Sequence, residues 1–280
     1  MSNKVHGLWI KGKLSAMELL TIESFMRHGF SFYLWTYEPA CINAHDGCIV
    51  NDANIILAEY TVFSYRKTNA FGHGKGSYAG FSDIFRYKLL YEKGGIWTDM
   101  DITCLRNFEI RDDYFFRFHH KTGAVGNFIK CPVHSPIMKW CYEQAVQKVN
   151  ADNTDWMLPI NILNEGIQIF ELQQYINQIS NNDSFPEVLP LISSKKPIPD
   201  NWNIIHWMNE EFRRLNINKD TVLINSTIQD LYAKNNIRYD YYRGKDIIIQ
   251  HIKLNRLAYL LHNIGPSIKW YYSVIQKIFR

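Results

Sequence analysis

Residues 81–105 read FSDIFRYKLLYEKGGIWTDMDITCL, and this stretch decides the expected fold. Its first half has apolar residues at helical spacing, with Asp83 and Arg86 three positions apart on one face. The helix is expected to stop at the glycine pair 94–95, and a strand carrying Asp99 and Asp101 follows. Two carboxylates at i and i+2 of an extended chain point to the same side. Both can therefore approach one divalent cation and a phosphate bound to it.

The Asp-x-Asp triplet alone is weak evidence, because it arises by chance roughly once in a chain of this length. Its neighbours are apolar on both sides, and carboxylates in such surroundings are costly to bury unless they are paired or metal-bound. The alternative is a solvent-exposed turn at the end of a strand, where the same two residues would have no chemical role.

The first hundred residues alternate short apolar runs (5–10, 30–37) with a helical pattern (14–28), which is typical of a parallel sheet covered by helices. Further strands are expected at 115–120 and 124–130, and a helix at 135–150. The glycine-rich residues 68–80 are expected to form a flexible approach to the site. Residues 181–202, rich in Pro, Ser and Asn, are expected to form a long loop or lid.

Composition places the chain among ordinary globular proteins, because 280 residues with 46% hydrophobic content can bury a substantial core. The five cysteines are odd in number and lack C-x-x-C spacing, which argues against a disulfide framework and a structural zinc site. With no leader-like pattern at its start, the chain is expected to be cytoplasmic. A net charge of +4 is too small to indicate a nucleic-acid partner.

The end of the chain is unusually basic. No acidic residue follows Asp246, whereas five basic residues do: Lys253, Arg256, Lys269, Lys277 and Arg280. Apolar residues at helical spacing follow a Gly265-Pro266-Ser267 start signal, which predicts an amphipathic basic helix. We therefore expect a catalytic domain at 1–245 and a tail at 246–280. The tail either packs on its own domain or binds the inner face of the cytoplasmic membrane through anionic lipid.

The block SDIFRYKLLYEKGGIWTDMDITCL (82–105) resembles the signature of DXD-motif glycosyltransferases of family 32, distant relatives of the glucosylating domains of clostridial toxins. HGLWI (6–10) and NIIHWMNEEFRR (203–214) resemble the first strand and the His-containing C-terminal segment of that family. The resemblance implies a GT-A fold, an α/β arrangement with a Rossmann-like mixed sheet flanked by helices and a mostly helical C-terminal extension. It also implies Mn²⁺ or Mg²⁺, a UDP-linked or other nucleotide-sugar donor, and retention of anomeric configuration.

The same resemblance assigns the donor-binding residues. It places Leu8 and Trp9 against the nucleobase, and Asp83 and Arg86 at the sugar hydroxyls. Trp97, where relatives often carry Tyr, keeps an aromatic contact to the donor but has no hydroxyl. From the residues alone, Trp9 can equally be a core aromatic on a first strand, and Asp83 and Arg86 a surface ion pair.

For the metal, the resemblance makes Asp101 a direct ligand, Asp99 a ligand through water that also contacts ribose and sugar, and His206 a second protein ligand. Asp99, Asp101 and Arg86 then form the catalytic set. Without the family, a lone His206 is more often a satisfied core histidine.

Three functions stay open at this point. A glycosyltransferase would act on a glycan or lipid-linked glycan acceptor, such as a lipopolysaccharide or capsule intermediate. A metal-dependent nucleotidyl- or phosphotransferase would need more basic residues around the phosphate than Arg86 and Lys75. A non-catalytic nucleotide-sugar-binding module is the third. His73 and the pair His119-His120 either line an acceptor cleft or lie on the surface.

Overall fold

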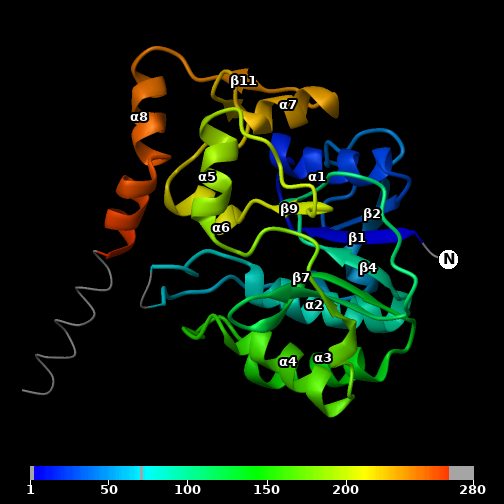
Figure 1. The fold of residues 1–280 in the computed structure, drawn as a ribbon. Helices are drawn as coiled ribbons and strands as arrows, with labels where there is room; N and C mark the ends of the chain where they lie inside the picture. Colours follow the sequence, from blue (N-terminus) through cyan, green and yellow to red (C-terminus); the bar gives the residue numbers. More distant parts are fainter. Residues whose placement is uncertain (1–2, 70–71, 265–280) are drawn as a thin grey trace, which may run out of the picture.

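A seven-stranded mixed sheet with the strand order β3-β2-β1-β4-β7-β6-β8 runs through the molecule (Figure 1). The structure is a computed structural model that describes residues 3–69 and 72–264. β1 is parallel to β2 and β4, and β2 is parallel to β3, whereas β7 runs antiparallel to both β4 and β6. The strands of this sheet are β1 (Lys4–Trp9), β2 (Ser31–Thr36), β3 (Ile49–Asp52), β4 (Gly95–Thr98), β6 (Phe115–His119), β7 (Gly123–Cys131) and β8 (Ile176–Asn177).

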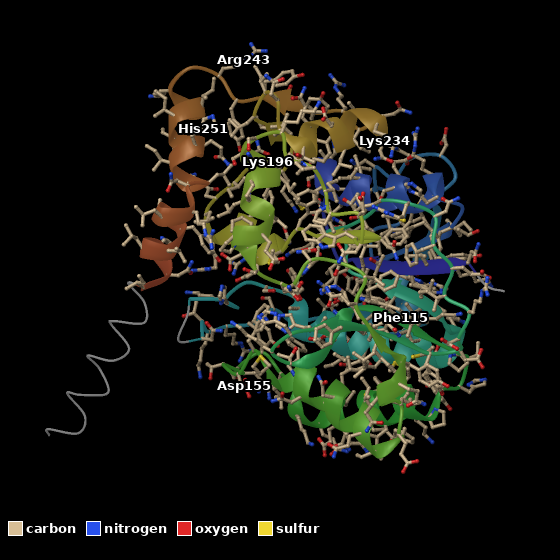
Figure 2. The ribbon with its side chains drawn as sticks, in the orientation of Figure 1. Phe115, Asp155, Lys196, Lys234, Arg243 and His251 are labelled. Atoms are coloured by element: carbon tan, nitrogen blue, oxygen red, sulfur yellow. The ribbon has the colours of Figure 1, made fainter. Side chains whose placement is uncertain are left out.

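Helices cover both faces of the sheet, so its central strands are apolar on both sides. Two successive residues of β4 show this, because Trp97 joins the core under α2, α3 and α4 while Ile96 joins the core under α1. Side chains fill the space between these layers (Figure 2). The helices are α1 (Ala16–Arg27), α2 (Ala79–Lys93), α3 (Pro136–Lys148) and α4 (Leu158–Ile169), with short 3-10 turns η1 (Ala53–Ile55), η2 (Glu59–Thr61) and η3 (Gln173–Tyr175).

The chain changes sheets immediately after β4. α2 ends where Gly94 and Gly95 both adopt positive φ, and a Cβ atom on Gly94 would lie 2.7 Å from the backbone nitrogen of Val133. β4 stops at Thr98, and residues 99–101 turn the chain into β5 (Ile102–Cys104). The prediction that a strand carries Asp99 and Asp101 is therefore wrong: both lie in the turn between two strands.

A second, two-stranded sheet then brings distant sequence to this turn. β5 pairs antiparallel with β9 (Ile204–His206), and Ile102 is the register partner of His206. The backbone amide of Trp207 also donates to the carbonyl of Asp101, at 2.9 Å. Residues separated by about a hundred positions in the sequence thus meet beside the DXD triplet.

The C-terminal part builds a third core around residues such as Phe185, Trp207 and Tyr232. Its elements are α5 (Phe185–Ser193), α6 (Asn209–Arg214), β10 (Thr221–Val222), α7 (Thr227–Lys234), β11 (Asp240–Tyr241) and α8 (Lys245–Lys253), and residues 256–264 are also helical. The expected long loop at 181–202 is wrong in its middle, where α5 forms. Pro186 lies in the first turn of α5, where its missing N–H costs nothing, and buried apolar residues hold the helix in place.

The expected Rossmann-like mixed sheet flanked by helices, with a mostly helical C-terminal extension, is confirmed. The strands expected at 115–120 and 124–130 and the helix expected at 135–150 also form. α8 begins at the expected boundary between residues 245 and 246, but the division into two domains stays a prediction. The helix expected after Gly265 lies outside the described residues.

Candidate active site

Asp99 is held on the sheet side of the turn by two donors. The Nη2 of Arg86 lies 3.0 Å from its Oδ1, and the indole nitrogen of Trp97 donates to the same oxygen at 2.8 Å. The guanidinium also lies over the Trp97 ring, 5.2 Å from its centroid. The side chain of Asp99 remains 30% exposed, so the carboxylate is fixed in direction yet accessible from outside.

Gly126 on β7 makes room for Arg86. A Cβ atom at this position would lie 2.2 Å from Nη1 of Arg86, far inside contact distance. The guanidinium is buried and pinned by carboxylates on two sides, so it cannot swing away freely. The position of Arg86 therefore depends on a glycine that sequence reasoning did not single out.

Asp83 is the second carboxylate on Arg86, with 3.2 Å between its Oδ1 and Nη1 of Arg86. The pair is buried, so the surface ion pair considered from the sequence does not describe it. Burial raises the pKa of Asp83 to about 6, although Arg86 opposes the rise, and the nearby charge of Asp99 adds to it. Asp83 and Asp99 thus share one arginine in the middle of α2.

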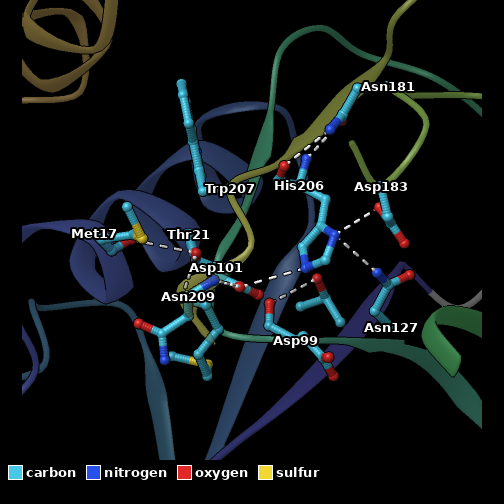
Figure 3. Close-up of polar contacts among 12 residues, drawn as sticks. Met17, Thr21, Asp99, Asp101, Asn127, Asn181, Asp183, His206, Trp207 and Asn209 are labelled. Atoms are coloured by element: carbon cyan, nitrogen blue, oxygen red, sulfur yellow. Dashed lines mark hydrogen bonds and ion pairs between the residues drawn. The ribbon is translucent and has the colours of Figure 1, made fainter. Parts of the chain in front are cut away.

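Asp101 points to the other side of the turn, toward the C-terminal part (Figure 3). Its Oδ2 accepts from the backbone amide of Asn209 at 2.6 Å and lies 3.3 Å from Nε2 of His206. Burial alone would raise its pKa, but the charge of His206 and these hydrogen bonds hold the pKa of Asp101 below its usual value. The two carboxylates of the DXD triplet therefore have different partners, although they are two residues apart.

His206 is fixed through its other ring nitrogen. Nδ1 lies 2.7 Å from Oδ1 of Asp183 and 3.2 Å from the side-chain amide of Asn127 (Figure 3). The backbone of His206 is also held, because Asn181 both accepts from its amide and donates to its carbonyl. Burial opposes a charged ring, yet Asp183 and Asp101 outweigh it and raise the pKa of His206 to about 10. The ring is therefore held in one orientation by polar partners on both of its nitrogens, and its role as a metal ligand stays a prediction.

Behind Asp183 lies a buried arginine that the sequence analysis missed. Arg117 makes a bidentate pair with Asp183, at 2.9 and 2.7 Å, and contacts Asn127, Ser180 and the carbonyl of Asn181. Despite its burial, Asp183 has a pKa well below its usual range, because His206 and Arg117 both stabilise the carboxylate. A charged residue inside the apolar run FFRFH was the one available signal, since an arginine there needs a partner.

The expected nucleobase end lies at the end of β1. Trp9 is half-buried, its indole nitrogen donates to the carbonyl of Gly12 at 3.0 Å, and Nζ of Lys219 lies 5.4 Å from its ring centroid. Leu8 is buried in the core under α2. Trp97 is also buried, and its indole N–H donates to Asp99, so its contact with the site is this hydrogen bond. The donor contacts of all three remain predictions.

The three other histidines considered from the sequence, His73, His119 and His120, share no hydrogen bond with His206. Nε2 of His73 contacts Glu211 at 2.9 Å and Arg214 at 2.8 Å, which ties the glycine-rich loop to α6. His119 is buried and contacts Thr122, and His120 is exposed beside it. Within residues 3–69 and 72–264, no group of three or more His, Cys, Asp and Glu side chains is close enough to hold a metal ion unaided.

A family model matches the part of the chain that contains the DXD turn. Residues 33–116 match the family model described as a glycosyltransferase sugar-binding region containing a DXD motif. No curated protein sequence matches the chain. Among solved structures, the PaToxG glycosyltransferase is 12% identical, with a TM-score of 0.43, over 62% of this chain and 74% of that chain. The mixed sheet is consistent with the expected GT-A fold. The matched residues 33–116 contain Asp99 and Asp101, so the DXD triplet lies in a part of the chain that is similar to a glycosyltransferase sugar-binding region.

Proposed function

We propose that this protein transfers a sugar from a nucleotide sugar, expected to be UDP-linked, to a glycan acceptor with the help of a divalent cation. The observation that carries the proposal is the DXD turn itself. Asp99 is accessible and held by Arg86, while Asp101 meets His206 from a distant segment of the chain. A turn built only for structure would not need to direct two neighbouring carboxylates at separate, buried cationic partners.

The residues beside Asp101 fit Mn²⁺ or Mg²⁺. A carboxylate oxygen and an imidazole nitrogen lie 3.3 Å apart, and the far nitrogen of that imidazole is held by a carboxylate, as is usual for metal-bound histidine. Asp101 and His206 would hold the cation, with Asp99 acting through water and the diphosphate oxygens completing the shell. When bound, the cation offsets the negative charge that develops on the departing diphosphate.

The neighbouring side chains would position the donor. Because Arg86 and Trp97 both donate to Oδ1 of Asp99, the other carboxylate oxygen can accept from a ribose or sugar hydroxyl. Asp83 can accept from a second hydroxyl while it stays paired with Arg86. This arrangement orients the sugar before reaction, which lowers the entropic part of the barrier.

Retention of anomeric configuration and a role in bacterial lipopolysaccharide or capsule synthesis are part of the proposal. Their support is the resemblance of residues 82–105 to family 32 enzymes. A retaining reaction by front-face attack needs no protein carboxylate to deprotonate the acceptor, because the departing phosphate can assist.

One experiment separates the candidate functions. The protein is incubated with UDP-glucose, UDP-galactose and other nucleotide sugars, with Mn²⁺ or with EDTA, and the products are identified by mass spectrometry. A glycosyltransferase releases UDP and a free or transferred sugar only with the cation, and proton NMR at early times reports the anomer. Release of UMP would indicate phosphotransfer instead, and binding without turnover would indicate a non-catalytic module.

A further inference from the structure

The described end of the chain packs on the domain through a narrow stripe. In α8 the buried residues are Gln250 and, just after the helix, Leu254. In the helical residues 256–264 it is Tyr259, whose ring lies 5.2 Å from that of Phe185. Asn255 separates the two helices and caps the second, because its side chain accepts from the amide of Leu257 at 2.9 Å.

The opposite face of both helices is apolar and exposed. At 100° per residue, Leu257, Leu261 and Ile264 lie well over 100° from Tyr259, and Ile248 and Ile252 likewise lie opposite Leu254. α8, which carries the labelled His251, and the helical residues after it lie at the edge of the molecule (Figure 2). The exposed face comprises Ile248, Ile249, Ile252, Leu257, Leu260, Leu261 and Ile264, with exposures between 43% and 65%. We call these seven residues the tail face.

Positive charge accompanies the tail face. Lys245 and Arg256 are exposed on the same two helices, and Asp246 is the last acidic residue of the sequence. Lys269, Lys277 and Arg280 follow later in the chain. An exposed apolar stripe with basic residues along it is the pattern of a helix that lies in the headgroup region of a bilayer.

We propose that the tail face binds the surface of a bilayer that contains anionic lipid. Such contact was expected for the tail at 246–280, with its amphipathic helix after Gly265, whereas the tail face assigns the contact to exposed residues of 248–264. Charge complementarity selects this occupant, because a second copy of the chain would bring the same basic residues together. The helices would lie in the surface, since no helix among the described residues is long and apolar enough to cross a membrane.

The tail face is connected to the candidate active site through α6. Asn263, on the second helix, accepts from Nη2 of Arg214 at 2.9 Å, and Arg214 pairs with Glu211. Asn209, at the start of the same short helix, donates its amide to Asp101. Through α6, the segment that would face the membrane is therefore connected to Asp101 of the DXD turn. The inference goes beyond the proposed function and holds whether or not the acceptor is lipid-linked.

Co-sedimentation of the full-length chain with vesicles tests the proposal. The test variant is Leu257→Gln with Leu261→Gln, in which two exposed residues become polar. The control variant is Ile55→Gln with Ile224→Gln, because these two residues are equally exposed, at 63% and 61%, but lie elsewhere. Vesicles contain phosphatidylcholine alone or with about one third phosphatidylglycerol, and circular dichroism checks that every variant is folded.

We expect the wild type and the control variant to pellet with the anionic vesicles, and less with neutral vesicles or at high salt. The test variant should partition at least tenfold more weakly. Failure of the wild type to pellet, or equal pelleting of the test variant, would overturn the proposal. The proposal would also be overturned if the wild type did not bind vesicles but formed a dimer that became monomeric in the test variant. That result would assign the tail face to contact with a second copy of the chain. Transferase activity does not enter these outcomes, so they are independent of the proposed reaction.

Discussion

Asp183 accepts from Nδ1 of His206 at 2.7 Å, while Nε2 of the same ring lies 3.3 Å from Asp101. One carboxylate thus fixes the ring from behind and the other faces it from the DXD turn. Without a cation the two carboxylates stabilise the protonated ring, which faces one carboxylate through each nitrogen, and they raise its pKa to about 10. A cation bound by Nε2 has to displace that proton, whereas the contact to Asp183 can stay in place.

Asp183→Asn should weaken Mn²⁺ binding by about 10–100-fold, because His206 loses the carboxylate that orients its ring and makes it a better ligand. The amide keeps the shape of the side chain but not its charge. Isothermal titration with Mn²⁺ measures the effect, and Asp230→Asn, which removes an exposed carboxylate paired with Lys195, serves as control. An unchanged dissociation constant for Asp183→Asn would show that Asp183 supports only the fold.

Gly126→Ala should displace Arg86 from Asp99, because the new methyl group would lie 2.2 Å from Nη1. We expect a loss of about 1–3 kcal/mol in the free energy of unfolding, as for other overpacked sites, together with weaker donor binding. A double-mutant cycle with Arg86→Ala tests the cause. If Gly126→Ala costs as much stability in the Arg86→Ala background as in the wild type, the two residues are not coupled.

Asp83→Asn should stabilise the protein at neutral pH by up to about 3 kcal/mol, since burial raises the folded-state pKa of Asp83 to about 6. The folded state then binds this proton more tightly than the unfolded state. The protonated carboxyl of Asp83 therefore contributes its full stabilisation below the unfolded-state pKa near 4. This contribution is lost as the pH rises through the folded-state pKa of about 6. Urea unfolding of both proteins at pH 4, 5, 6 and 7 should show a difference that grows with pH. A constant difference would contradict the assignment.

Trp9→Ala should raise the dissociation constant of UDP by the loss of a stacking contact, on the order of 1–3 kcal/mol. In the structure Lys219 lies over one face of the ring, so the base would stack on the other face or displace the lysine. Intrinsic fluorescence in the wild type and in Trp9→Phe separates the Trp9 signal from those of the other tryptophans. Identical titration curves for these two proteins would place the base elsewhere.

The order of the first elements could be predicted because their signals are local. Apolar periodicity marks α1 and α2, and the glycine pair 94–95 marks the end of α2. The position of Asp99 and Asp101 could not be predicted in the same way. A three-residue turn that changes sheets looks like a continuous strand in sequence, and only the pairing of β5 with β9 distinguishes them. The helix α5 was missed because its two prolines and neighbouring serines outweighed its apolar pattern.

The site residues also differ in whether a local sequence signal identifies them. The pairing of Asp83 with Arg86 follows from helical spacing, and both were identified from sequence. Asp183, Arg117 and Gly126 were not, because their roles arise from contacts between segments that are far apart in the chain. Burial decided one alternative that the sequence left open, because it excludes a surface ion pair for Asp83. For His206, the contacts to Asp101 and Asp183 are those of a satisfied histidine, so its role as a metal ligand stays a prediction.

The most direct test of the central claim is the rate of Mn²⁺-dependent sugar release from a UDP-sugar by Asp101→Asn. The amide keeps an acceptor for the backbone amide of Asn209 but removes the charge that faces His206. The account predicts that the variant folds, as judged by circular dichroism, and loses about 10²–10³-fold in kcat/KM, equivalent to several kcal/mol. The Asp230→Asn control should keep the wild-type rate. Wild-type turnover by Asp101→Asn, with the same dependence on Mn²⁺, would contradict the role of the DXD turn in metal-assisted glycosyl transfer.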